Sequence, residues 1–126
     1  MIPYARDRWP SAQDAAVLTA GLWAEFHNGY HDPVPGRGDL GQALGSLDSD
    51  ACDRLVQAAT RSSAPVVLRR NLSACIRALA ADAVAPDWAR LHADNFAILS
   101  GYADDVWRRW LTGALHRPTD DETDEA

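Results

Sequence analysis

The sequence predicts an all-α protein, a compact bundle of about six helices with an irregular N-terminal lead-in and a disordered acidic C-terminal tail. Alanine and leucine outnumber valine and isoleucine, which favours helices over strands. Apolar residues also recur three and four positions apart, the spacing of one helical face. The length of 126 residues suits one domain. We therefore expect a single helical domain over residues 1–116 and a tail over residues 117–126.

The first half of the chain contains two expected helices separated by a loop. After the lead-in MIPYARDRWP, Ser11 and Asp14 form an approximate capping box, which predicts a first helix over residues 12–27. Residues 28–38, NGYHDPVPGRG, hold three glycines and two prolines and so predict a loop. A short helix is expected from residue 39 to about residue 47.

Four further helices follow from caps and breaks in the second half of the chain. Asp48 or Ser49 is a good N-cap, Pro65 fits a first helical turn, and Gly101 is a stop signal. We expect these helices at about residues 49–61, 64–81, 86–101 and 104–116. The remaining residues, 117–126, carry five acidic side chains and no large apolar one, so they cannot bury enough surface to fold.

Composition limits the environment of the protein and its chemistry. Cys52 and Cys75 lie at core-facing helical positions, where a reduced thiol acts as a small apolar group. The chain has no apolar run of membrane-spanning length, so we expect a cytoplasmic protein without a membrane partner. His27 and His31 lack a third metal ligand, and no nucleophile stands with a base and an orienting group. We therefore expect no metal, no cofactor and no enzymatic activity.

Residues 54–81 differ from the rest of the chain because they contain five arginines and no acidic residue, whereas the whole chain has a net charge of −6. A step of seven residues is nearly two helical turns, so Arg54 and Arg61 share one line and Arg70 and Arg77 another. The apolar residues of both segments fall on the opposite faces. Exposed arginines are also common as solvated surface, so spacing alone does not identify a partner.

Residues 86–115, PDWARLHADNFAILSGYADDVWRRWLTGAL, resemble the C-terminal signature of the CasB family, the small subunit of type I-E CRISPR Cascade complexes. An Asp-Trp entry at Asp87 leads into a helix with Leu91 and Asp94, and a V-x-x-x-W helix ends at Trp110. Upstream, residues 40–44, LGQAL, and the Leu-Arg-Arg element at residues 68–70 also match the family pattern. The resemblance covers roughly residues 15–115 in the right order. Family members usually carry a further N-terminal segment, so we expect a shortened small subunit or one part of a divided one.

The resemblance implies a non-enzymatic subunit that stabilises guide RNA, target strand and displaced strand through sequence-independent arginine–phosphate contacts. It implies other Cascade subunits, guide RNA, target DNA and a second copy of the chain as partners. The alternatives are a helical protein–protein adaptor or regulator with no nucleic-acid role and, less favoured, a helix-turn-helix regulator. Arg69 lies at the edge of an apolar stripe, where it also suits a structural ion pair. The candidate nucleic-acid contacts are Arg54, Arg61, Arg69, Arg70 and Arg77, with Arg108 and Arg109 as flanking residues.

Overall fold

A computed structural model describes the backbone of residues 3–115 and the side chains of residues 12–115. The described chain forms six α-helices: α1 (Pro3–Phe26), α2 (Leu40–Leu44), α3 (Ser49–Thr60), α4 (Pro65–Ala81), α5 (Trp88–Leu99) and α6 (Ala103–Leu115). The six helices confirm the predicted fold class. The predicted acidic tail, residues 117–126, lies outside the described residues.

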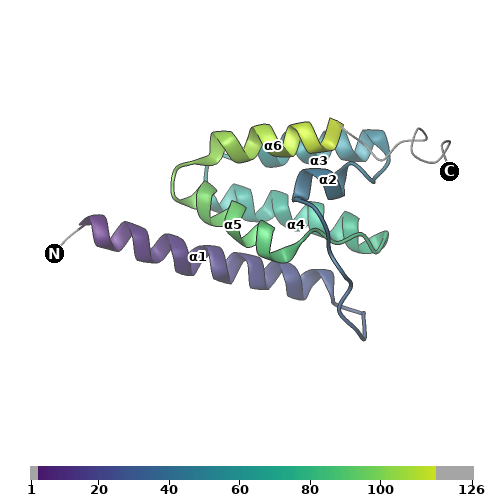
Figure 1. Cartoon of the computed structure of the whole chain (residues 1–126), viewed down its shortest axis with the longest axis horizontal. Coiled ribbons are helices and arrows are strands. Elements are labelled where there is room, and N and C mark those ends of the chain that lie inside the picture. The colour runs from purple at the N-terminus through teal and green to yellow at the C-terminus, as the bar shows by residue number, and fades with distance from the viewer. Residues whose placement is uncertain (1–2, 116–126) are drawn as a thin grey trace.

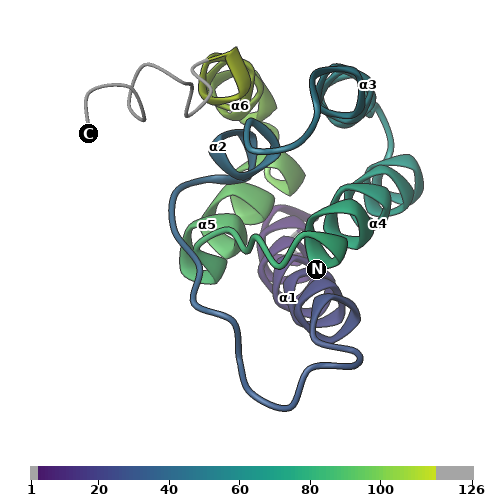
Figure 2. The ribbon, with the colours of Figure 1, turned by 90° about the vertical axis from the view of Figure 1, so that its right-hand side faces the viewer.

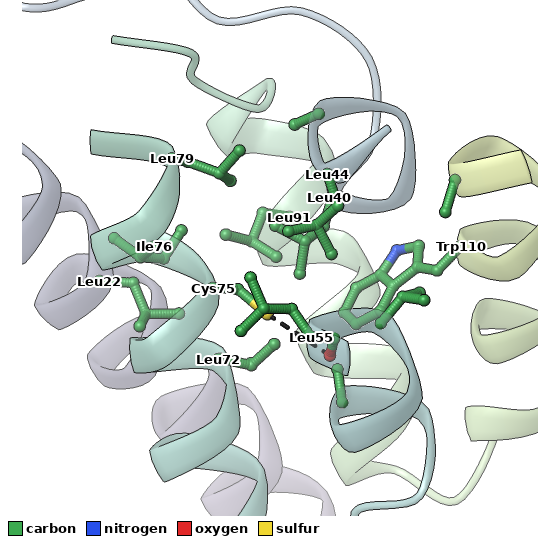
Figure 3. Close-up of a cluster of buried hydrophobic side chains, with 14 of the residues drawn as sticks. Leu22, Leu40, Leu44, Leu55, Leu72, Cys75, Ile76, Leu79, Leu91 and Trp110 are labelled. Atoms are coloured by element: carbon green, nitrogen blue, oxygen red, sulfur yellow. Dashed lines mark hydrogen bonds between the residues drawn. The ribbon is translucent and has the colours of Figure 1, made fainter. Parts of the chain in front are cut away.

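The helices are arranged in three layers (Figures 1 and 2). α4 and α5 form the middle layer, α1 lies on one side of them, and α2, α3 and α6 lie on the other. The core fills the space between these layers, where Leu72, Ile76 and Leu79 of α4 meet Leu91 of α5 and Trp110 of α6 (Figure 3). All five side chains are fully buried. α4 is therefore the central element of the bundle.

Helix starts agree with the sequence where a side chain caps the helix. The Asp48 carboxylate accepts a hydrogen bond from the Ala51 amide at the start of α3, and Asp87 accepts from the Ala89 amide at the start of α5. In α2, Asp39 and Gln42 form a complete capping box. These contacts satisfy amides that have no partner within the helix.

Two helix boundaries differ from the prediction. α1 begins at Pro3, so residues 3–10 belong to this helix and not to an irregular lead-in. We placed the start at residue 12 because Ser11 and Asp14 form an approximate capping box, yet α1 runs through Pro10 and Ser11. α2 ends at Leu44 and not near residue 47, because Gly45 caps its last turn.

Residues 28–38 form the predicted loop, which is fastened to the body at several points. The Tyr30 hydroxyl donates to the Ala80 carbonyl oxygen at 2.6 Å, and the Val34 amide donates to Nε2 of His27 at 3.1 Å. Near its end the loop makes an isolated parallel bridge between Gly36 and Ala85. The loop thus brings the chain back across α5 to begin α2 on the far side of the bundle (Figure 2).

α2 and α6 approach each other closely because glycines occupy their contact. A Cβ atom on Gly41 would overlap the backbone of Trp110, and one on Gly113 would lie 2.9 Å from the Gln42 amide nitrogen. Both positions are buried. The short α2 is held against α6 only because neither residue has a side chain.

Replacing Gly41 with alanine tests this contact. We expect Gly41→Ala to lower the free energy of unfolding by about 3 kcal/mol, because α2 must move away from α6. Gly21 is a matched control, since it also lies inside a helix but its Cβ would meet nothing within 4 Å. Gly21→Ala should raise the free energy of unfolding by roughly 0.5–1 kcal/mol. Urea denaturation measures both, and equal stability of the two variants would contradict the close contact.

The buried Cys75 thiol makes the fold sensitive to alkaline pH. Its sulfur lies 3.9 Å from the Leu55 carbonyl oxygen (Figure 3), and burial raises the pKa of Cys75 from 9.0 to about 12. The unfolded thiol loses its proton at lower pH than the folded one, so stability is complete below pH 9 and falls as pH rises from 9 towards 12.

We expect this thiol to cost on the order of 2 kcal/mol of stability at pH 10.5 relative to pH 7.5. In Cys75→Ala that part of the alkaline loss should be missing, whatever the variant's stability at pH 7.5. Urea denaturation of both proteins at the two pH values gives the comparison. An identical alkaline loss in both would show that Cys75 does not cause it.

Candidate nucleic-acid interface

The arginines of α3 and α4 lie on the outside of the bundle. Arg54 on α3, Arg61 at the C-cap of α3, and Arg70 and Arg77 on α4 are all exposed. The apolar stripe of each helix, by contrast, is buried. Helical spacing predicted this division. We call these four residues the arginine face.

α3 and α4 hold the arginine face as one unit. The Asn71 side chain of α4 donates from Nδ2 to the Ala58 carbonyl oxygen at 3.0 Å and to the Ser62 hydroxyl at 2.9 Å. The two helices also pack directly against each other. Each row of arginines lies opposite the buried residues of its own helix, so both rows face away from the core. Their positions are fixed by the packing beneath them.

Most of the arginine face has no acidic partner among the described side chains. No ion pair within residues 12–115 involves Arg54, Arg61 or Arg70. Arg77 is different, because its Nε lies 3.9 Å from Oε2 of Glu25 on α1. Glu25 in turn accepts a hydrogen bond from the Ser73 hydroxyl at 2.7 Å. The charge of Arg77 is therefore partly neutralised.

Arg69 lies apart from the arginine face. It lines a cavity of about 850 Å³ between α1 and α4, together with Asp14, Glu25, Val17 and Val66. The two valines are largely exposed, at 72% and 77%. Arg69 makes no ion pair with the described side chains, so the structural ion pair considered for it from the sequence is not formed there.

Arg109 is a structural residue. Its Nη2 donates to Oδ1 of Asp94 at 2.8 Å and its Nη1 to Oδ2 of Asp94 at 3.2 Å. Nη1 also lies 3.6 Å from Oδ2 of Asp39, and both carboxylates are almost fully buried. The hydrogen bonds that Arg109 donates to Asp94, more than any other contact, raise the pKa of Arg109. Its flanking partner Arg108 is exposed and pairs only with Asp105 on its own helix.

The group around Asp94 was not foreseen. Besides the two bonds from Arg109, Oδ2 of Asp94 accepts a hydrogen bond from the Trp110 indole at 2.9 Å. Asp39, the N-cap of α2, completes the group, which we call the Asp94 network: Asp39, Asp94, Arg109 and Trp110. The available signal was that two polar residues, Asp94 and Asn95, follow Leu91 on the buried side of α5, where polar side chains require partners.

Neither a metal centre nor a membrane span is found in the described part of the chain. Within it, no group of three or more His, Cys, Asp or Glu side chains could hold a metal ion. None of the helices formed by residues 3–115 is long and apolar enough to cross a membrane.

Substitution of Asp94 tests the network. Asp94→Asn removes the charge that faces Arg109, so we expect the free energy of unfolding to fall by about 3 kcal/mol. Asp105→Asn is the control, because it removes the carboxylate of the exposed Arg108 pair and should change stability by less than about 0.5 kcal/mol. Thermal or urea denaturation separates the two outcomes. A small change in the free energy of unfolding for Asp94→Asn would mean that water replaces the contacts of Arg109 at no cost.

Comparison with known proteins gives one match. The family model of CRISPR-associated protein Cse2 matches residues 2–113, the greater part of the chain. Neither the search of curated proteins nor the search of solved structures found a match. The family match confirms the resemblance to CasB, another name for the same small subunit, and implies a non-catalytic subunit associated with other Cascade subunits. The chain therefore belongs to the Cse2 family, the small subunits of type I-E CRISPR Cascade.

Proposed function

We propose that this subunit stabilises the guide RNA, the target strand and the displaced strand of the surveillance complex through phosphate contacts made by the arginine face. The observation that carries the proposal is the group of exposed arginines, Arg54, Arg61 and Arg70, that lack an acidic partner among the described side chains. They occupy two packed helices within a chain whose net charge is −6.

The chemistry of the face suits backbone contacts. Arginine presents a planar fork of donors that matches phosphate oxygens, and its charge is independent of pH in the physiological range. Contacts of this kind position a nucleic acid without reading its bases. Binding should weaken steeply as salt rises, because each phosphate contact releases condensed counterions. A subunit that supports any guide and any target needs this lack of sequence preference.

The arginines differ in the role that we assign to them. Arg54, Arg61 and Arg70 are the principal phosphate contacts because their charges are exposed and unpaired among the described residues. Arg77 contributes less, since Glu25 lies 3.9 Å away. Arg69 and Arg108 flank the face from the cavity and from α6. We assign Arg109 to the Asp94 network and not to phosphate, because two carboxylates already occupy it.

In this proposal the subunit acts in the cytoplasm as a single helical domain over residues 1–116. A second copy of the chain and the other Cascade subunits would extend the arginine face along the bound strands. No step of catalysis is assigned to it. Its contribution is to lower the free energy of the opened target by neutralising phosphates that would otherwise repel one another.

One observation favours the alternative of a protein–protein adaptor. Residues 15–24 of α1, AAVLTAGLWA, contain no charged side chain, although several of them are exposed. Val17 of this stretch is 72% exposed, and Val66 beside the same cavity is 77% exposed. A helix that is apolar on all sides is usually covered by another element. This surface supports protein contacts, whether or not the arginine face binds nucleic acid.

A pair of matched double variants tests the nucleic-acid role. Arg54→Gln with Arg70→Gln removes two charges from the arginine face, and Arg37→Gln with Arg90→Gln removes two exposed charges elsewhere. In the complex reconstituted with guide RNA, we expect the first pair to weaken target-DNA retention roughly tenfold at low salt. The slope of log affinity against log salt should fall by about 2. The second pair should leave both nearly unchanged.

Equal retention by the two double variants would show that the arginine face is only solvated surface. The adaptor function would replace our proposal if the purified chain neither joined a guide-RNA complex nor bound nucleic acid at low salt. Circular dichroism of both variants gives the control for folding, because all four arginines are exposed and no loss of helix is expected.

A further inference from the structure

Residues 117–126 carry most of the net negative charge of the protein. Residues 117–126 hold one arginine against five acids, a net charge of −4, whereas the whole chain has a net charge of −6. The remaining 116 residues are therefore only at −2. The five acids lie within six consecutive positions: Asp120, Asp121, Glu122, Asp124 and Glu125.

The helix that precedes this segment, α6, ends beside the C-cap of α2, a few residues before α3 begins. α6 ends at Leu115, and its last turn approaches Gly45, the C-cap of α2: a Cβ on Gly45 would lie 3.2 Å from the Gly113 carbonyl oxygen. Four residues after Gly45, α3 begins at Ser49. α6 and α3 also pack directly against each other. Figure 1 shows the C-terminal end of α6 beside α2, at the same end of the bundle.

The length of the segment matches the distance it must cover. Ten residues in an extended conformation reach about 33 Å. α3 has 12 residues and is therefore about 18 Å long. A ten-residue segment that follows α6 is therefore long enough to pass Arg54 and Arg61 and reach α4.

We propose that residues 117–126 bind the arginine face of the same chain and compete there with nucleic acid. The proposal rests on the function proposed for that face. Arg54, Arg61 and Arg70 have no ion-pair partner among the described side chains, and the segment supplies carboxylates in excess. Arg77, by contrast, is already near Glu25. The arginines are positive and lack described partners, and the segment is negative, so we infer that the segment is the ligand of the arginine face.

The contact between the segment and the arginine face is weak, so a nucleic acid can displace the segment. Exposed carboxylate–guanidinium pairs contribute little each and are screened by salt. A tether raises the effective concentration of the segment to about the millimolar range, so several weak pairs still compete at low salt. A nucleic acid presents a denser row of charges and displaces the segment when many phosphates are held nearby. The segment therefore suppresses binding of stray nucleic acid more than binding inside the assembled complex.

Two full-length triple variants test the competition with equal changes in net charge. The first is Asp120→Asn, Asp121→Asn and Glu122→Gln in the segment. The second is Asp14→Asn, Asp32→Asn and Asp104→Asn, three exposed acids of the body. Fluorescence anisotropy with a labelled single-stranded oligonucleotide should show about three- to tenfold tighter binding for the first variant at 50 mM salt. The gain should vanish near 300 mM salt, and the body variant should gain much less.

Adding Arg54→Gln and Arg70→Gln to both chains completes a thermodynamic cycle. We expect the gain from the segment variant to disappear in this background, because the segment no longer has its partner. Equal gains from the segment and body variants, or a gain that persists without these arginines, would show a general effect of net charge and overturn the proposal.

NMR of the free chain separates this proposal from the proposed function. The side-chain Nε–H signals of Arg54, Arg61 and Arg70 should move between the native chain and the segment variant, while those of Arg37 and Arg90 stay. If they move but neither protein binds the oligonucleotide, the segment contact stands and the nucleic-acid role fails. If none moves, or if they move while affinity for the oligonucleotide is unchanged, the competition is refuted.

Discussion

The carboxylate of Asp94 joins three helices in the interior of the bundle. It lies on α5, accepts hydrogen bonds from Arg109 and Trp110 of α6, and is linked through Arg109 to Asp39 at the start of α2. A buried carboxylate is costly unless its oxygens are paired, so these contacts require one orientation of α6. α6 in turn packs against α3, which carries the first row of arginines. The orientation of the first row of arginines therefore depends on the packing of α3 against α6, and so on the contacts of Asp94.

α2 shows how the network and the glycine contact act together. A helix of five residues is too short to be stable by itself. Asp39 caps it by accepting from the Gln42 amide at 2.9 Å, and the same carboxylate lies near Arg109. Gly41 and Gly113 then let the two backbones meet. α2 therefore depends on tertiary contacts for its stability, although its N-cap can be recognised in the local sequence.

Features set by residues close together in the sequence could be predicted, whereas contacts between distant residues could not. The stripe of α4 and the caps Asp48 and Asp87 are local patterns, and they placed three helices within about two residues. The start of α1 was misplaced, because Ser11 and Asp14 have the spacing of a capping box although they lie inside a helix that begins at Pro3. Arg109 was expected outside, beside Arg108, since spacing gives a direction but no partner. Its two carboxylates come from residues 15 and 70 positions away.

Arginine serves two purposes in this chain, and the neighbouring carboxylates decide which. Arg109 of α6 is paired with Asp94 of α5. Arg54, Arg61 and Arg70, by contrast, face outward without a described acidic partner. α4 takes part in two surfaces. Its outward side bears Arg70 and Arg77. Its Val66 and Arg69 border the cavity beside the uncharged stretch of α1. One helix thus contributes both to the arginine face and to the wall of the cavity. Because α4 is also the centre of the core, a partner on either surface would meet an element that cannot yield without disturbing the whole bundle.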